Sequence, residues 1–205
     1  MVRDPVSSGG TDDEGQIEFT PPAVEFTVHN GGTRRSVITR LVMTIEDSTV
    51  IEQCAADGAP VAVSASYDVT LPLRPADGTE LQVPVSQQQR PDEADRFAVR
   101  IGTPEPGSRT TVHLYRVRFE LVVGGAPARV PAGTAVVAAP MAPLDGDGYF
   151  WSETYDSGEV VFDPYPGLER DIACMRRNSG TLQEFLAGGA ELSPELAESK
   201  SVMRL

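Results

Sequence analysis

Apolar and polar residues alternate along most of residues 23–140, and this period of two constrains the fold more than any other feature of the chain. Successive side chains of a strand point to opposite faces, so the pattern predicts strands with one buried face. It is clear in Val24, Phe26 and Val28, and again in Val37, Thr39, Leu41, Met43 and Ile45. The same alternation recurs in "SYDVTLP", "ELQVPVS", "DRFAVRIG", "LYRVRFELVV" and the apolar run "TAVVAAP".

Turn-forming segments separate these runs, among them "ADGAP", "RPADGT", "QQRPDEA" and "TPEPGS". About seven or eight strands, divided by turns and without a helical period, predict a mostly β fold, an antiparallel immunoglobulin-like β-sandwich. Pro84 cannot donate to a strand ladder, so its strand is expected at a sheet edge or at a bulge. The longest runs, 36–46 and 112–123, are expected as central strands.

The loop "HNGGTRRS" lies between two predicted strands and has two interpretations. As a hairpin turn, Asn30, Gly31 and Gly32 supply positive-φ positions, and Arg34 and Arg35 begin the return strand in water. As an anion-binding loop, the two arginines grip a ligand. The loop matches neither phosphate-binding glycine motif and leads into a strand, which favours the hairpin. Arg34 and Arg35 are kept as candidate binding residues.

Three regions are expected along the chain. Residues 1–22 are polar and predicted to form a disordered acidic lead-in, residues 23–140 form the sandwich, and residues 141–205 hold an aromatic acidic segment and helices packed on or beside it. The segment "GLERDIACMRRNSG" predicts a helix that stops at Gly180, and a second helix is expected from Thr181. Ser193 and Pro194 suit the N-cap and first position of a third helix.

The net charge of −13 argues against nucleic-acid partners, which require a cationic face. No apolar run approaches the roughly 20 residues that span a bilayer, and the first residues resemble no signal peptide, so direct membrane insertion is not expected. The chain as given favours a cytoplasmic location. A fragment of a membrane-anchored parent would instead lie outside the cytoplasm.

The two cysteines, Cys54 and Cys174, are expected as separate thiols packed as small hydrophobic groups. The alternative is a disulfide, which would close a loop of over a hundred residues. The chain-entropy argument gives such a loop about 4 to 5 kcal/mol of stabilisation.

Catalytic and metal-binding motifs are weak. His29 and His113 fall on predicted strands, and the sequence contains no G-x-S-x-G elbow. Cysteines and histidines lack the spacing of a zinc site. In "DGDGYFWSETYD", Asp145, Asp147 and Asp156 take the first, third and twelfth places of a calcium loop, but Phe150 stands where a glycine is needed. We therefore expect no metal and no cofactor. Arg116 and Arg118 are expected on a solvated strand face with cross-strand ion pairs.

The aromatic acidic segment after Pro140 is the main candidate site. Tyr149, Trp151 and Tyr155 occur at odd positions, so in an extended segment they share one face that can stack on sugars or anchor a protein partner. The alternative is a flap whose rings seal the open end of the sandwich.

The residues "VEFTVHNGGTRRSVITRLVMTIED", "YDVTLP", "PDEADRFAVRIG" and "VHLYRVRFELVV" resemble an actinobacterial immunoglobulin-like β-sandwich module with a V-x-N-x-G pattern in its first hairpin. The resemblance covers roughly residues 23–140. It implies an immunoglobulin-like fold, often attached to larger or membrane-anchored proteins, and it supplies no catalytic residues.

Two functions follow from these observations. The first is a non-enzymatic accessory or regulatory module that contacts a protein partner through the aromatic acidic segment and the C-terminal helices. The alternative is a sandwich that binds a small molecule or carbohydrate, or an enzyme of a biosynthetic pathway, with Tyr149, Trp151 and Tyr155 roofing its pocket.

Overall fold

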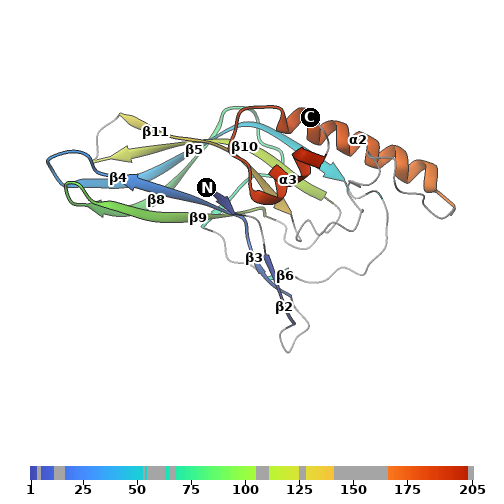
Figure 1. Ribbon diagram of the computed structural model, residues 1–205, viewed down its shortest axis with the longest axis horizontal. Helices are drawn as coiled ribbons and strands as arrows, with labels where there is room; N and C mark the ends of the chain where they lie inside the picture. The colour runs from blue at the N-terminus through green and yellow to red at the C-terminus, as the bar shows by residue number, and fades with distance from the viewer. Residues whose placement is uncertain are drawn as a thin grey trace.

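The computed structural model describes residues 1–3, 6–11, 17–52, 54, 63–64, 68–104, 111–124, 128–140 and 166–202 (Figure 1). This part of the chain is mostly β. Two four-stranded sheets, rich in antiparallel pairs, share one hydrophobic core. The predicted mostly β, sandwich-like fold is therefore confirmed.

Each sheet draws strands from distant parts of the chain. The first sheet has the order β1 (Val2–Arg3), β4 (Ala23–His29), β9 (Ala94–Gly102) and β7 (Val69–Thr70). The second has the order β11 (Arg129–Pro140), β10 (Thr111–Val123), β5 (Ser36–Glu52) and β8 (Thr79–Gln89). A small third sheet joins β2 (Val6–Thr11), β3 (Ile17–Thr20) and β6 (Val63–Ser64). The strands predicted to be central are β5 and β10, which both have neighbours on two sides.

Pro84 lies where its chemistry predicts. Its strand, β8, forms an edge of the second sheet. The pairing of β5 with β8 also shifts register between Ile38 and Arg40, and Arg40 lies opposite Pro84. The missing N–H of Pro84 is thus accommodated by both an edge and an irregularity in the ladder.

The main core lies between the two sheets, as the alternating pattern requires. Three aromatic rings occupy its middle: Phe26 stacks on Phe97 and meets Phe119 edge to face, with both centroid separations 5.2 Å. Such pairs add specific ring contacts to the burial of large apolar surface. Around them lie Leu41, Met43, Ile45, Val99, Ile101, Tyr115 and Val117.

The predicted hairpin at residues 30–35 is wrong. β4 pairs with β9, whereas β5 pairs with β10 and β8, so the loop crosses from one sheet to the other. Gly31 and Gly32 also lack the expected positive φ, which among the described glycines occurs at Gly78, Gly124, Gly133 and Gly167. Packed sheets lie only about 10 Å apart, a distance that a short loop spans as readily as it closes a hairpin.

The first residues contain strands where a disordered lead-in was expected. β1 pairs antiparallel with β4, with Val2 opposite Val24. The Val2 side chain is 2% exposed and joins the main core. One well-placed valine thus gives this end of the chain an apolar contact that its polar composition does not suggest.

Two helices cover part of the outer face of the second sheet. α2 (Leu168–Leu186) and α3 (Pro194–Val202) enclose a second core with β5, β10 and β11 (Figure 1). The predicted stop at Gly180 is wrong, since α2 continues through it. Burial of Leu182, Phe185 and Leu186 outweighs the roughly 1 kcal/mol that a glycine costs inside a helix. The predicted cap of α3 is confirmed: Ser193 Oγ accepts a hydrogen bond from the Leu196 N–H at 3.3 Å.

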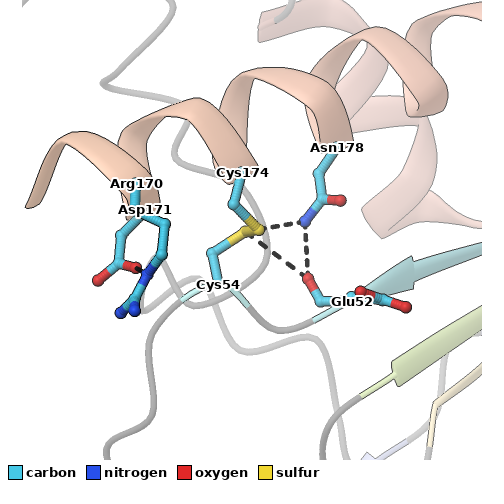
Figure 2. The surroundings of a disulfide bond; sticks show 6 residues. All are labelled: Glu52, Cys54, Arg170, Asp171, Cys174 and Asn178. Atoms are coloured by element: carbon cyan, nitrogen blue, oxygen red, sulfur yellow. Dashed lines mark hydrogen bonds and ion pairs between the residues drawn. A yellow bond between two sulfur atoms is a disulfide. The ribbon is translucent and has the colours of Figure 1, made fainter. Parts of the chain in front are cut away.

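A disulfide joins Cys54 to Cys174, so the expectation of two separate thiols is wrong. It connects the chain just after β5 to the middle of α2 (Figure 2). Asn178 supports the same junction, because its side-chain N–H donates to the Glu52 carbonyl at 2.8 Å and lies 3.1 Å from Cys54 Sγ. The helix is therefore held to the end of β5 by a covalent bond and by a hydrogen bond one turn further along.

The two arginines of β10 have different roles. Arg116 is half-buried at the end of the helical layer, where it donates to the Phe185 carbonyl and lies over the Phe185 ring, 5.2 Å from its centroid. α2 has no basic residue in its last turn, so Arg116 supplies the cation that favours a helix C-terminus. Lys200 of α3 adds a second one by donating to the Leu186 carbonyl at 2.7 Å.

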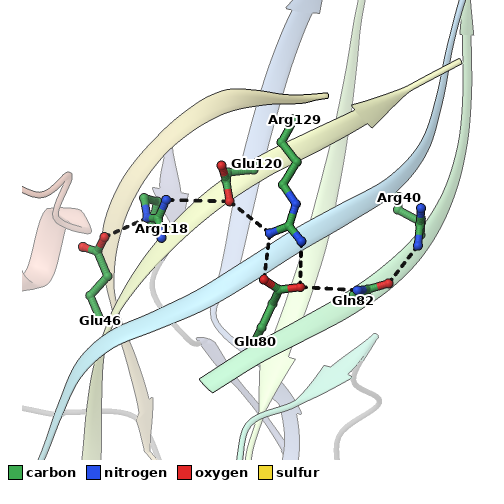
Figure 3. Close-up of polar contacts among 7 residues, drawn as sticks. All are labelled: Arg40, Glu46, Glu80, Gln82, Arg118, Glu120 and Arg129. Carbon is green, nitrogen blue, oxygen red and sulfur yellow. Dashed lines mark hydrogen bonds and ion pairs between the residues drawn. The ribbon is translucent and has the colours of Figure 1, made fainter. Parts of the chain in front are cut away.

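Arg118 lies in the predicted solvated setting, in a polar network across the outer face of the second sheet (Figure 3). It binds Glu46 at 2.8 Å, and Arg129 contacts Glu80 through two hydrogen bonds of 2.7 and 3.0 Å. Val42, opposite Glu120 and Gln82 in the strand registers, is nevertheless fully buried. The aliphatic stems of these long side chains provide the cover that apolar neighbours would otherwise give.

We expect the double substitution Cys54→Ser and Cys174→Ser to lower the free energy of unfolding by about 4 to 5 kcal/mol, because the unfolded chain regains the entropy of an open loop. Urea denaturation of the oxidised protein and the variant measures this difference. Reductant should destabilise the wild-type protein and leave the variant unchanged. Two titratable thiols in the folded, unreduced protein would contradict the disulfide.

Arg116 and Arg118 form a matched pair on one strand. Arg116→Ala should lower the free energy of unfolding by about 1.5 to 3 kcal/mol, the range for a partly buried hydrogen bond from a charged group. Arg118→Ala should cost at most about 1 kcal/mol, since its ion pairs are exposed to solvent. Thermal and urea unfolding of both variants test this order, and equal losses would refute the capping role of Arg116.

Candidate functional site

A cavity of about 870 Å³ opens between the two sheets at the end where β4 passes into β5, on the left of Figure 1. We call it the end cavity. Its walls come from β4, β5, β10 and β11, with single contributions from β8 and β9. The apolar lining includes Phe26, Val28, Ile38, Leu121, Val123 and Ala132.

The sizes of the inward-facing side chains explain the cavity. The middle of the sandwich is filled by the rings of Phe26, Phe97 and Phe119. Beyond them, towards the end of the sheets, the inner positions include the small side chains of Val28, Val123 and Ala132, which are partly buried. Protein interiors are normally close-packed, so smaller side chains on facing strands leave space between them.

A β-bulge shapes the rim on β11. Phe119 pairs with Gly133 and Glu120 with Pro131, so Ala132 is the extra residue of the bulged strand. Gly133 has a φ of 109°, a value that side-chain-bearing residues rarely adopt. The bulge bends the edge of the second sheet at the point where it borders the end cavity.

Asn30 fastens the two loops at this end. Its side-chain amide nitrogen lies 2.8, 3.2 and 3.0 Å from the carbonyls of Arg34, Gln89 and Arg90. Its backbone N–H donates to the Glu93 carbonyl at 3.0 Å, and its own carbonyl accepts from Asp92 at 2.8 Å. One residue thus links the β4–β5 crossing to the β8–β9 turn.

Ion pairs hold the rim on the first sheet. The Glu25 carboxylate contacts Arg3 of β1 at 2.9 Å and Arg96 of β9 at 3.5 Å. The hydrogen bond from Arg3, together with the charge of both arginines, lowers the pKa of Glu25. The carboxylate therefore stays ionised at neutral pH and ties β4 to both of its neighbours.

Gln89 is the unusual polar residue of the end cavity. It occupies an inward position of β8, in line with Val83 and Val85, and is 2% exposed. Its side-chain Nε2 has no hydrogen-bond partner among the described residues. A buried amide donor normally finds an acceptor, because leaving it unsatisfied costs about 1 to 3 kcal/mol.

The mouth of the end cavity exposes apolar surface. Met1 and Val130, at 57% and 48%, are the exposed large hydrophobic side chains of the described chain, and both line the cavity. Single exposed apolar residues are common, but a pair at the mouth of an apolar cavity marks a surface suited to an apolar ligand.

The histidines do not assemble a catalytic site. Both lie on strands as expected, but His29 is at the cavity rim, where its Nε2 lies 3.1 Å from Asp92 Oδ1. His113 is buried near the opposite end of β10, and burial, with a smaller contribution from Arg74, lowers its pKa. No His, Cys, Asp and Glu cluster suited to a metal occurs in the described ranges.

The residues predicted as a site have different outcomes. Tyr149, Trp151 and Tyr155 lie outside the described residues, as do the aspartates of the calcium-like segment, so their roles stay predictions. Arg34 and Arg35 are exposed in the loop whose flanking residues, Asn30 and Ser36, line the end cavity. Sequence reasoning missed the cavity itself. A visible signal was Gln89, a polar residue at the inward position of an alternating strand.

Comparison with protein-family models, curated proteins and solved structures finds no match to this chain. Among the described helices, none has the length and apolar character needed to cross a membrane.

We expect Asn30→Ala to loosen the end of the sandwich, because the amide group that lies within hydrogen-bond distance of three carbonyls is lost. The free energy of unfolding should fall by about 1 to 3 kcal/mol. Hydrogen exchange of the Asn30 and Asp92 amides should also become faster. Gln88→Ala, at an exposed position of β8, is the control and should change neither quantity. Unchanged amide hydrogen exchange in Asn30→Ala would contradict the role of Asn30 in linking the two loops.

Proposed function

We propose that this chain is a non-enzymatic binding module that holds a small, largely apolar molecule in the end cavity. The observation that carries the proposal is a cavity of about 870 Å³, open to solvent, whose lining combines apolar side chains with polar and charged ones. Ligand sites in proteins have volumes of roughly 300 to 1,000 Å³ and this same mixture of lining residues. The proposal corresponds to the small-molecule alternative from the sequence, placed at a different site.

Three features distinguish the end cavity from loose packing. The hydrogen bonds of the Asn30 side chain and the ion pairs of Glu25 fix its rim. Phe26, which lines the cavity, is held in place by ring contacts with Phe97 and Phe119. Its mouth displays Val130 in solvent, where a bound apolar molecule would cover it. A preformed site of this kind loses little conformational entropy on binding.

We also propose that the module works in an oxidising compartment outside the cytoplasm. The disulfide between Cys54 and Cys174 supports this location, because such bonds are rare in cytosolic proteins and persist in secreted ones. This favours the view of the chain as part of an exported or membrane-anchored protein.

We also propose a family for the sandwich and a role in protein contact. An immunoglobulin-like module of actinobacterial type is supported by the resemblance of residues 23–140 and by a sandwich-like core between two antiparallel-rich sheets. A role in protein contact is supported by the alternating Tyr149, Trp151 and Tyr155 in an acidic segment. Both proposals are compatible with a small-molecule site in the end cavity. This cavity and the Cys54–Cys174 bond lie at opposite ends of the second sheet.

Binding of a neutral naphthylamine dye, whose fluorescence rises in apolar surroundings, tests the proposal. We expect saturable binding of one dye per chain. Ala132→Trp, which places a large ring in the end cavity, should weaken binding at least about tenfold, or about 1.4 kcal/mol. The matched control is Ala76→Trp in an exposed turn, which should bind as the wild-type protein does. Equal binding by both variants would place the dye elsewhere and refute the proposal.

A further inference from the structure

We infer that the ligand of the end cavity is an amphipathic carboxylate, with an aliphatic tail in the apolar part and its carboxylate at the loop end, near Gln89 and Arg35. This inference rests on the proposed binding function and adds the chemical class of the ligand. It follows from the kind of polar groups that surround the cavity at that end.

The first observation is the donor on Gln89. Its Nε2 is buried without a partner, in a residue that lines the end cavity. An amide N–H requires an acceptor, and a carboxylate oxygen is a strong one because hydrogen bonds to ionised groups are stronger than neutral ones. A purely hydrocarbon ligand would leave this donor unsatisfied.

The second observation is the position of two arginines beside that donor. Ser36 is the strand partner of Gln89, so Arg35 is one residue from the same point in the sheet. Arg34 is fixed nearby, because its carbonyl accepts from Asn30 at 2.8 Å. Arg34 and Arg35 are not among the residues that line the end cavity, so the amide donor of Gln89 lies in the cavity and the charge of the loop lies beside it.

The third observation is that these arginines have no acidic partner in the described part of the chain. Other arginines of the two sheets, such as Arg3, Arg100 and Arg129, each pair with a carboxylate within 3.0 Å. Arg34 and Arg35 form no such pair there, although the chain carries a net charge of −13. Their charge is therefore open to an anionic ligand that binds at the loop end.

The walls of the end cavity complete the match. Phe26, Ile38 and Leu121 form an apolar part of the lining, and Asn30, Ser36 and Gln89 form a polar part at the loop end. A ligand with one charged head and an apolar tail satisfies both regions, whereas a sugar would leave its hydroxyl groups against apolar side chains. Burying such hydroxyl groups without partners is costly.

Competition between the bound naphthylamine dye and three ligands with the same tail tests the inference. These ligands are dodecanoate, dodecanol and dodecyltrimethylammonium, each used below its micelle concentration. We expect dodecanoate to displace the dye at a concentration at least about tenfold lower than dodecanol, with the ammonium compound weakest. The preference for dodecanoate should weaken at high salt, because salt screens exposed charges.

Variants locate the recognition of the carboxylate. Gln89→Leu should remove at least about threefold of the preference for dodecanoate over dodecanol, and the pair Arg34→Gln and Arg35→Gln should remove most of the rest. Gln88→Leu, at an exposed position outside the end cavity, is the control and should keep the full preference. An unchanged far-UV circular dichroism spectrum and thermal midpoint in every variant separate loss of head recognition from loss of folding.

The outcomes separate the two proposals. Equal displacement by dodecanoate and dodecanol would overturn the carboxylate inference and leave the binding function standing. A preference for dodecanoate that survives in all variants would overturn the assignment to Gln89, Arg34 and Arg35. Failure of the dye to bind the wild-type chain would overturn the binding function and this inference together.

Discussion

The pairing of β5 with β10 is the contact on which the rest of the structure depends. The two strands are antiparallel neighbours from Glu52 opposite Thr111 to Ile38 opposite Val123. Their inner faces, with Leu41, Met43, Val117 and Phe119, form a large part of the main core. β8 and β11 attach to their free edges, and the helices cover part of their outer faces. Each layer of the molecule is therefore anchored to this central pair.

Three outward-facing residues of β10 lie in three different environments. Leu114 is buried beneath the helices, Arg116 lies at the end of the helical layer, and Arg118 lies in solvent with its ion pairs. The change from apolar to charged side chains occurs where the helical cover ends. Successive outward-facing residues of β10 thus determine where the helices pack and where the sheet faces solvent.

Features set by neighbouring residues were predictable from the sequence. The strands follow from local alternation, the edge position of β8 from the missing donor of Pro84, and the start of α3 from Ser193. Features set by distant residues were not. A turn at residues 30–35 is visible in the sequence, but the strands that pair with β4 and β5 on either side of it are determined by distant residues. The bond between Cys54 and Cys174 joins positions 120 residues apart, and their spacing carries no signal of contact.

The candidate site shows the same division. An inward Gln89 and an arginine-rich loop can be read from the chain, since each depends on one strand or loop. The cavity itself cannot, because its volume depends on Val28, Val123 and Ala132 facing one another from strands that are far apart in sequence. Likewise, the local sequence predicts a helix stop at Gly180, but burial of Leu182 and Phe185 against the sheet favours continuation of α2.

The Cys54–Cys174 bond also has a mechanical consequence. Under tension along the chain, force passes directly from the residue after β5 to α2 through the sulfur atoms, and the residues between them are bypassed. Strands β6 to β11 lie within this bypassed part. With 120 residues of sequence separation and about 3.4 Å per extended residue, roughly 400 Å of contour length is withheld while the bond is intact. Pulled at both ends, the oxidised module would extend only by its flanking segments.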